Sequence, residues 1–232
     1  MDKVRDRVRD KVTAPVYEAR SLEVRLSGQR VLGPLDLQVE RGSFLGILGP
    51  NGSGKTTLLR ALTGEVEPSA GEVLLDERPV PDYRPGELAR LAGVVPQQFN
   101  LDFAFTVEEM VAMGRYAQDA PAADGEAVAA ALEATGMTTF ADRLIIELSG
   151  GERQRALIAQ TLAQQTPILL LDEPLNNLDL NHQLELMQLL SRLHREGRTI
   201  LLVLHDLNMA AQYCDELVLL SQGQLAARGT PN

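Results

Sequence analysis

The sequence contains one cysteine, Cys214, among 232 residues. A lone cysteine excludes an intramolecular disulfide and favours a reducing, cytosolic setting. Apolar residues never run for the roughly 18 positions that a membrane-spanning helix needs, and the N-terminus has no apolar stretch typical of a signal peptide. Basic residues are outnumbered, with 22 lysines and arginines against 32 aspartates and glutamates. The net charge of −10 argues against non-specific binding of nucleic acid, which needs a basic surface.

What is present is a pattern typical of an α/β fold. Short apolar runs predict buried strands at residues 44–48, 92–95, 168–172 and 199–204. Helical spacing predicts helices at residues 55–62, 152–164 and 181–195. Strands that alternate with helices indicate a parallel sheet with crossover helices, and a chain of this length can bury one such core.

The two ends of the chain have simpler patterns. Residues 1–16 are predicted to be a charged extension. Its valines recur at every fourth position, which permits a short amphipathic helix, but we favour a solvated segment because so short a helix is marginal alone. Residues 17–42 alternate in polarity and predict an antiparallel β subdomain, and residues 216–220 and 224–227 predict a hairpin.

Residues from about 98 to 151 contain no candidate strand. Thr106 and Glu109 form a capping-box pattern that opens a helix reaching about residue 116, and an alanine-rich helix follows at 126–135. We therefore expect a helical subdomain inserted into a core formed by residues 17–97 and 152–232.

One short segment is rich in glycine and ends in lysine. The string G-P-N-G-S-G-K-T matches the phosphate-binding loop (P-loop) pattern G-x-x-x-x-G-K-[ST] and lies between a predicted strand and a predicted helix, as that motif requires. Backbone N–H groups can turn toward phosphate oxygens there, Lys55 adds positive charge, and Thr56 offers a hydroxyl to Mg²⁺. This context disfavours a surface turn without a ligand. We predict that ATP and Mg²⁺ are bound by Gly49, Pro50, Asn51, Gly52, Ser53, Gly54, Lys55, Thr56 and Thr57.

Two carboxylates follow the apolar run at residues 168–171. Ligands gather at the carboxyl ends of strands in open α/β sheets. Asp172 can hold Mg²⁺ there, usually through water, and Glu173 can orient and polarise an attacking water. Adjacent acids are also common in ordinary loops, and the phosphate-binding loop upstream is what favours the functional interpretation.

A glycine pair occurs in the segment L-S-G-G-E-R-Q. Ser149 and Glu152 form a capping-box pattern, so a well-capped helix is one interpretation. Gly150 and Gly151 would in addition expose several N–H groups beside a serine hydroxyl at a helix N-terminus, which favours binding of an anion such as phosphate.

These motifs together resemble one family. G-P-N-G-S-G-K-T-T, V-V-P-Q-Q, L-S-G-G-E-R-Q-R, L-L-L-D-E-P, N-N-L-D and a late strand ending in His205 and Asp206 follow in the order found in the ATP-binding cassette (ABC) family. The resemblance covers residues 17–231 and implies a single ABC nucleotide-binding domain at 17–232 with a P-loop NTPase core.

The resemblance implies roles for residues around one nucleotide. Glu173 corresponds to the catalytic base, and His205 to a histidine that contacts the γ-phosphate. Gln97 corresponds to a glutamine that reaches Mg²⁺ and the attacking water and links to a transmembrane partner. The doublet with Gln98 leaves a one-residue ambiguity, and we prefer Gln97 because it follows V-V-P directly. The metal would be held by Thr56, Gln97 and Asp172.

The resemblance also implies that two copies of the chain pair head-to-tail around two ATP molecules. The ATP held by one copy would then be contacted by the other copy through Ser149, Gly150, Gly151 and Glu152. Asp179, at the end of N-N-L-D, would lie at the interface between the copies.

Two positions depart from the family pattern. The family often stacks adenine on an aromatic residue, but that position falls near Leu26, so we expect loose selectivity for the base. Leu175 stands where the family usually has threonine or a small residue.

Several segments are similar to ATPases of iron-siderophore, haem and cobalamin importers. They are residues 86–90, 105–115 and 205–215, and the run at 101–105 favours haem slightly over siderophore. The sequence has no fused membrane domain, so the implied partners are polytopic transmembrane permease subunits and, indirectly, a substrate-binding protein, with no nucleic acid. We expect a peripheral location at the cytoplasmic face of the inner (plasma) membrane. The alternative is a soluble ABC ATPase of an assembly machine such as iron–sulfur cluster biogenesis.

Overall fold

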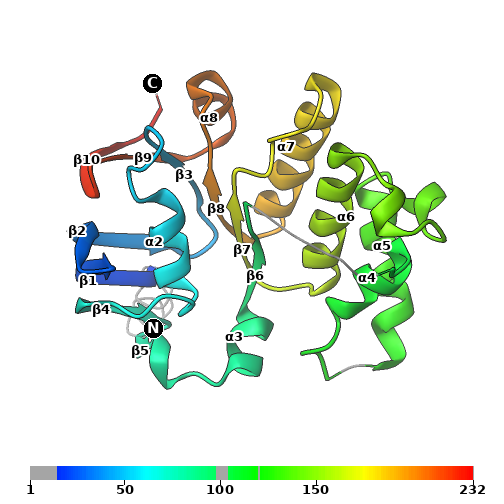
Figure 1. Cartoon of the computed structure of the whole chain (residues 1–232), viewed down its shortest axis with the longest axis horizontal. Coiled ribbons are helices and arrows are strands. Elements are labelled where there is room, and N and C mark those ends of the chain that lie inside the picture. Colours follow the sequence, from blue (N-terminus) through cyan, green and yellow to red (C-terminus); the bar gives the residue numbers. More distant parts are fainter. Residues whose placement is uncertain (1–14, 98–103, 120, 232) are drawn as a thin grey trace, which may run out of the picture. The chain divides into compact units, whose positions relative to one another are not determined.

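The computed structural model describes residues 15–97, 104–119 and 121–231. They form two compact units. Unit 1 contains the described residues up to 84 and from 194 onward, and unit 2 contains those from 85 to 193. Figure 1 colours unit 1 blue to cyan and orange to red, and unit 2 green to yellow. Most of the predicted N-terminal extension, and also Gln98, lie outside the described residues.

Unit 1 contains an antiparallel sheet with the strand order β2-β1-β4-β5. Its strands are β1 (Pro15–Leu26), β2 (Gln29–Glu40), β4 (Ala70–Leu75) and β5 (Arg78–Pro79). Ser27 and Gly28 join β1 to β2 with φ of 51° and 81°, the left-handed backbone that tight hairpins need. Along β2, buried and exposed residues alternate, so one face packs on the core. The antiparallel strands expected at 17–42 are confirmed.

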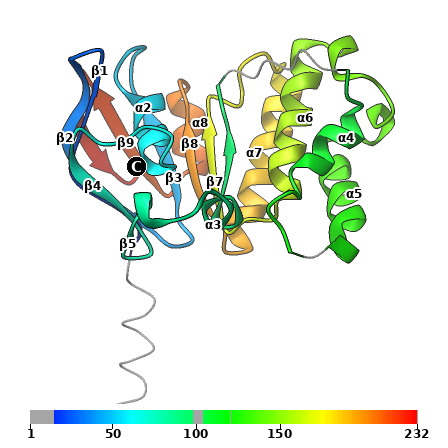
Figure 2. The same cartoon turned by 60° about the horizontal axis from the view of Figure 1, so that its bottom comes forward.

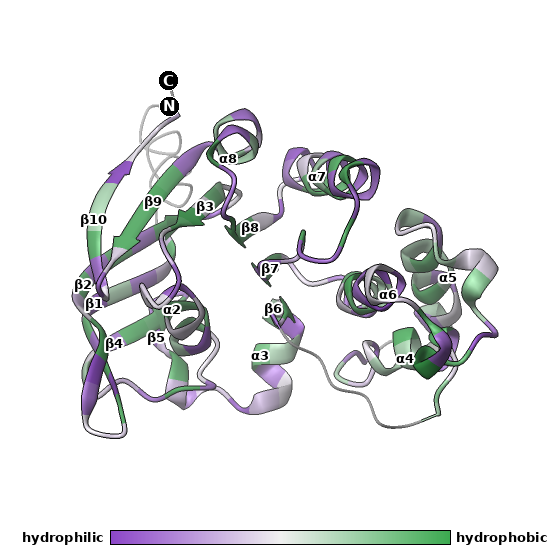
Figure 3. Ribbon diagram, turned by 45° about the horizontal axis from the view of Figure 1, so that its top comes forward, coloured by the Kyte–Doolittle hydropathy of each residue, from purple (hydrophilic) through white to green (hydrophobic). Residues whose placement is uncertain are grey.

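Parallel strands carry the rest of unit 1. β3 (Phe44–Leu48) pairs in parallel with both β8 (Thr199–Val203) and β9 (Glu216–Ser221), and β10 (Gln224–Gly229) pairs antiparallel to β9. Every residue of β3 and β8 is buried, and Figure 3 shows β3, β8 and β9 largely in green, the hydrophobic colour. The helices of this unit are α2 (Lys55–Leu62), α8 (Leu207–Tyr213) and the 3₁₀ turn η1 (Val80–Asp82). The predicted strands, helix and terminal hairpin of this unit are confirmed.

Unit 2 contains two parallel strands, β6 (Ala92–Val95) and β7 (Ile168–Asp172). Its helices are α3 (Pro85–Leu91), α4 (Val107–Met113), α5 (Asp124–Ala134), α6 (Gly150–Ala163) and α7 (Leu180–Arg195), whose last two residues fall in unit 1. Three 3₁₀ turns complete it, η2 (Pro121–Ala123), η3 (Thr138–Phe140) and η4 (Ile145–Glu147). α4, α5 and α6 lie side by side (Figure 2).

The helices expected in the middle of the chain are confirmed as helices. Between 104 and 150, the described residues contain no strand apart from an isolated bridge between Thr106 and Leu144. The predicted boundaries between a core and a helical subdomain differ from the boundaries of the two units. That division therefore stays a prediction. No helix of the described residues is long and apolar enough to cross a membrane.

Candidate nucleotide site

The P-loop joins β3 to α2 in unit 1. Gly49 has a φ of 151°, and a Cβ there would overlap the carbonyl oxygen of Leu220, so a side chain has no room. Gly54, with a φ of 98°, precedes the first residue of α2. A Cβ on Gly54 would come within 2.9 Å of a Leu32 methyl and 3.0 Å of the Val31 carbonyl oxygen. The glycines therefore let the loop fold tightly against its neighbours.

Lys55 lies at the N-terminus of α2 and is 5% exposed. Its Nζ donates to the carbonyl oxygens of Gly49, at 2.8 Å, and of Pro50, at 3.1 Å. The ammonium group is thereby held over the loop, where the first N–H groups of α2 have no partner within the helix. Positive charge and unpaired donors at one point form a site for an anion.

A second hairpin supports the loop from the other side. The N–H of Gly223, in the β9–β10 turn, donates to the carbonyl oxygen of Ser53 at 3.1 Å, and the carbonyl oxygen of Gly223 accepts from the N–H of Gly33 in β2. Ser53 is 2% exposed, and its Oγ has no hydrogen-bond partner among the described residues. A buried hydroxyl of this kind calls for a polar ligand, and the loop therefore fits a phosphate chain.

Two acids end β7 in unit 2. Asp172 and Glu173 are 4% and 8% exposed. Glu173 has a φ of 52°, which is rare for a residue with a side chain. Its Oε2 accepts from Gln97 Nε2 at 2.8 Å and from Asn176 Nδ2 at 2.8 Å. The structure thus brings together Gln97 and Glu173, which belong to motifs distant in the sequence. Asn176 is a further side-chain partner of Glu173 that was not predicted.

The glycine pair opens α6, as the capping pattern predicts. The Ser149 hydroxyl accepts from the Glu152 N–H at 3.4 Å, and the Glu152 carboxylate accepts from the Ser149 N–H at 2.7 Å. That hydrogen bond from the Ser149 backbone lowers the pKa of Glu152. A Cβ on Gly151 would lie 2.9 Å from the carbonyl oxygen of Asn177, so glycine lets the start of α6 approach the loop after β7.

Asp179 immediately precedes α7, and its carboxylate contacts a residue in the first turn of that helix. Its carboxylate accepts from the His182 N–H at 3.0 Å and contacts His182 Nδ1 at 2.8 Å. The backbone hydrogen bond from His182 is the main cause of the lowered pKa of Asp179. His182 was not predicted from the sequence, although an aspartate just before a helix is a recognisable N-cap.

The remaining candidates lie in unit 1. His205 is exposed and follows β8 closely. The next residue, Asp206, caps α8 by accepting from the N–H groups of Asn208, at 2.7 Å, and Met209, at 3.1 Å. Leu26, at the end of β1, is 44% exposed. The P-loop and His205 thus belong to unit 1, whereas Gln97, Asp172, Glu173, Asp179 and the glycine pair belong to unit 2.

The sequence is similar to many ATP-binding proteins of transporters. The family model described as ABC transporter matches residues 32–176. The chain is 46% identical over 222 residues to a hemin import ATP-binding protein, HmuV, of Pseudomonas aeruginosa, covering 93% of this chain and 87% of that protein. It is 47% identical over 221 residues to an uncharacterized ABC transporter ATP-binding protein, YvrA, of Bacillus subtilis, and spans half of that protein's length.

Solved structures agree with the sequence comparison. The structure of cbiO1 of Clostridium perfringens, part of the ABC transporter complex cbiONQ, matches with a TM-score of 0.82 and 31% identity, over 94% of this chain and 89% of that one. A dimeric ATP-binding cassette in a post-hydrolysis state, bound to ADP and Pi, matches with a TM-score of 0.84 and 28% identity, over 93% and 99%. The predicted fold class, an α/β ABC ATPase core, is therefore confirmed. The chain belongs to the ABC transporter family and is one of its ATP-binding ATPases.

Proposed function

We propose that this chain is the ATP-hydrolysing subunit of an importer for an iron complex, with haem as the first candidate cargo and siderophores and cobalamin as related ones. Similarity to hemin import ATP-binding proteins over nine-tenths of the chain is the observation that carries this proposal. We have no observation that favours an assembly ATPase of the iron–sulfur cluster type.

In this proposal the P-loop of unit 1 binds the phosphates of ATP. The residues from Gly49 to Thr57 supply N–H groups, Lys55 supplies charge, and the buried hydroxyl of Ser53 supplies a further polar group. Mg²⁺, held by Thr56, Asp172 and Gln97, would neutralise charge that develops on the phosphates. The donor set fits that ion, because hydroxyl, carboxylate and amide oxygens are ligands that Mg²⁺ accepts.

Glu173 acts as the base that orients the attacking water. Its carboxylate is buried and fixed by two side-chain amides, which is the arrangement that a base needs if it is to hold one orientation. His205 contacts the γ-phosphate. Hydrolysis in this proposal depends on electrostatic positioning and forms no covalent intermediate with the protein.

We propose a head-to-tail dimer in which each copy completes the other's site. Ser149, Gly150, Gly151 and Glu152 contact the nucleotide of the partner copy, and Asp179 lies at the interface. The capped start of α6 supports this, because its first N–H groups and the Ser149 hydroxyl are suited to an anion. A dimeric solved relative bound to ADP and Pi supports the pairing.

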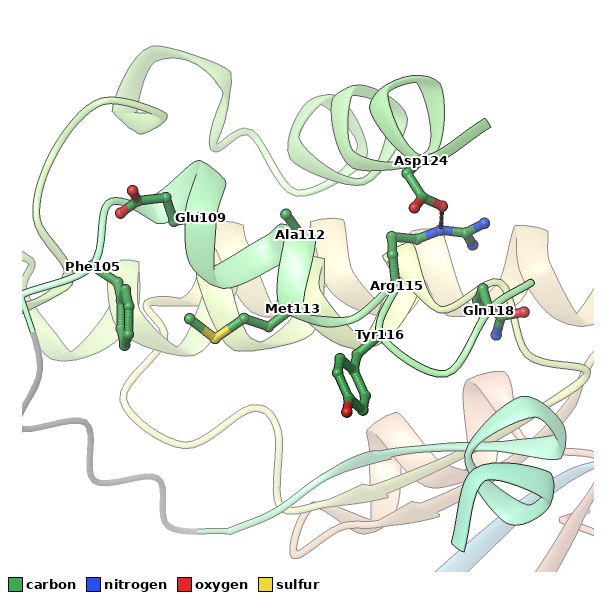
Figure 4. Close-up of a pocket in the computed structure, with 8 residues that line it drawn as sticks. All are labelled: Phe105, Glu109, Ala112, Met113, Arg115, Tyr116, Gln118 and Asp124. Carbon is green, nitrogen blue, oxygen red and sulfur yellow. Dashed lines mark hydrogen bonds and ion pairs between the residues drawn. The ribbon is translucent and has the colours of Figure 1, made fainter. Parts of the chain in front are cut away.

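A groove in unit 2 is the surface that we assign to the permease (Figure 4). It has a volume of about 570 Å³ and is lined by Phe105, Glu109, Ala112, Met113, Arg115, Tyr116, Gln118 and Asp124. Phe105 and Tyr116 point to the same side in Figure 4, with Met113 lying between them, and Tyr116 is 96% exposed. Exposed aromatic and methionine side chains of this kind are typical of protein contacts, which fits a peripheral location at the cytoplasmic face of the membrane.

Reconstitution tests the proposal. The tagged chain is purified with the membrane proteins that accompany it and incorporated into liposomes with hemin, a ferric siderophore or cobalamin offered on the side opposite the chain. We expect a polytopic partner and ATP-dependent uptake of one cargo, lost in the Glu173→Gln variant. Recovery with scaffold proteins alone, and no uptake of any of the three, would contradict the importer assignment while leaving the ATPase assignment standing.

A further inference from the structure

Asn176 has an unusual relationship to the carboxylate that ends β7. Its backbone N–H donates to the carbonyl oxygen of Glu173 at 3.1 Å, which closes a turn over residues 173–176. Its side-chain Nδ2 donates to Oε2 of the same residue at 2.8 Å. One residue thus fixes both the backbone and the carboxylate of Glu173.

The conformation of Glu173 needs such support. A φ of 52° at a residue with a side chain is unfavourable and persists only where neighbouring groups enforce it. Such strain occurs most often at functional sites. Here the turn sets the direction of the side chain, and the two amides set the orientation of its carboxylate.

The two amides that share Oε2 differ in their attachment. Gln97 is exposed and precedes Glu173 by 76 residues, so its contact depends on the position of a separate segment. Asn176 belongs to the same turn as Glu173 and moves with it. A local hydrogen bond of this kind orders few additional groups, so it costs little conformational entropy.

We propose that Asn176 is a positioning residue for ATP hydrolysis, which holds the carboxylate of Glu173 in its working orientation whether or not Gln97 is in place. This inference rests on the proposed role of Glu173 as the base. The hydrogen bond between Gln97 and Glu173 can then break during the ATPase cycle while Glu173 keeps its orientation. The neutral amide suits this role, since it orients the carboxylate without neutralising it as a lysine or arginine would.

A matched control separates positioning from loop stability. Gln183, in the first turn of α7, donates through Nε2 to the carbonyl oxygens of Leu175, at 3.2 Å, and Leu178, at 3.1 Å. Its amide therefore braces the same loop as Asn176, but it does so through hydrogen bonds to backbone carbonyl oxygens. If Asn176 acted only by stabilising the loop, Gln183→Ala would lower turnover as much as Asn176→Ala does.

The experiment measures steady-state ATP hydrolysis by the full chain, with its permease where turnover requires it. We expect Asn176→Ala and Asn176→Asp to lower kcat about 10-fold or more, with a change in KM for ATP below about twofold, because only the geometry of the base is disturbed. Gln183→Ala should retain kcat within about twofold. An unchanged kcat in Asn176→Ala, or an equal loss in Gln183→Ala, would overturn the inference.

A second readout does not depend on activity. In a ¹⁵N-labelled chain without nucleotide, the side-chain NH₂ signal of Asn176, assigned from its absence in Asn176→Asp, should shift in Glu173→Ala and shift little in Gln97→Ala. If the Asn176 signal did not shift in Glu173→Ala, the contact itself would be overturned. Normal turnover in Glu173→Gln would remove the base and this inference together, whereas loss of turnover there with an unaffected Asn176→Ala would overturn the inference alone.

Discussion

The side-chain amide of Gln97 donates to Oε2 of Glu173 over 2.8 Å, although 76 residues separate them in the sequence. One follows β6 and the other follows β7, and these two strands pair in parallel with Val95 opposite Leu171. Because the carboxyl ends of parallel strands lie at one edge, residues just beyond them meet. This register explains why two motifs of unit 2 converge on a single carboxylate.

Glu173→Gln should separate nucleotide binding from hydrolysis. The glutamine keeps the shape of the side chain but cannot act as a base, so we expect kcat to fall about 100-fold or more while ATP still binds. Binding is measured by titration with ATP and turnover by phosphate release. Glu126→Gln, on the exposed side of α5, is the control and should retain normal turnover. Normal turnover in Glu173→Gln would sink the assignment of the base.

Lys55→Ala should weaken ATP binding itself. Nζ lies 2.8 Å from the Gly49 carbonyl oxygen, so the charge is fixed at the loop. Loss of charge-assisted hydrogen bonds of about 1.5–3 kcal/mol corresponds to a rise in Kd of about 10- to 100-fold. Calorimetric titration with ATP measures it. Arg60→Ala, which removes an exposed ion pair with Glu65 in the last turn of the same helix, should leave Kd unchanged.

The two capping boxes permit a paired test. Ser149 caps α6 and Thr106 caps α4 with the same reciprocal hydrogen bonds. Alanine at either position should lower the free energy of unfolding by about 1 kcal/mol, as measured with urea. Only Ser149→Ala should also lower ATPase turnover, because only that cap is proposed to contact nucleotide. Equal turnover in the two variants would count against the shared site.

Arg115 should be a major contributor to the stability of unit 2. Its side chain is 5% exposed and donates to Asp124, at 2.7 Å, and to the carbonyl oxygen of Ala163, at 2.8 Å. Arg115→Ala leaves both acceptors without their donor, so we expect a loss of about 3 kcal/mol in urea unfolding. Arg90→Ala, which breaks the exposed pair with Asp119, is the control and should cost far less. Similar losses in the two variants would contradict the role of burial.

Cys214 should report on unfolding. The thiol is buried, and desolvation, with a smaller effect of Asp215, raises its pKa from an ordinary 9.0 to about 12. Iodoacetamide at pH 8 should therefore modify the folded chain far more slowly than the chain in urea, as mass spectrometry can follow. The pKa of the thiol is higher in the folded chain than in the unfolded chain. The contribution of the thiol to the free energy of unfolding is therefore complete below about pH 9 and declines as the pH rises toward 12. Rapid labelling of the folded chain would contradict this.

The sequence predicted the elements that depend on local signals. Continuous apolar runs identified β3 and β7, and side-chain spacing identified both capping boxes, since these signals arise within a few residues. β4 was not predicted, because its first three residues are exposed and its apolar pattern is short. α8 was not predicted either, although Asp206 is an ordinary capping residue.

Parts of the site depend on contacts across the fold. The hydrogen bond of Asn176 to Glu173 forms in a turn where Glu173 has a positive φ, and the sequence indicates neither. The acceptors around the buried Arg115 come from two other segments, one with Asp124 and one with Ala163 and Gln165, and no local pattern indicates that. The P-loop, in contrast, could be identified from sequence because backbone N–H groups perform most of its chemistry and glycine spacing records them.

The hydrogen bonds of Gly223 to Ser53 and Gly33 also bear on biosynthesis. The P-loop leaves the ribosome more than 160 residues before the turn that supports it, since Ser53 and Gly223 are that far apart. All of unit 2 is translated in the interval. Because domains fold as they emerge, a nascent chain can fold unit 2 first. The P-loop lacks its hydrogen bond to the β9–β10 turn until that turn has been translated. Nucleotide binding therefore signals a chain whose β9–β10 hairpin has already been translated.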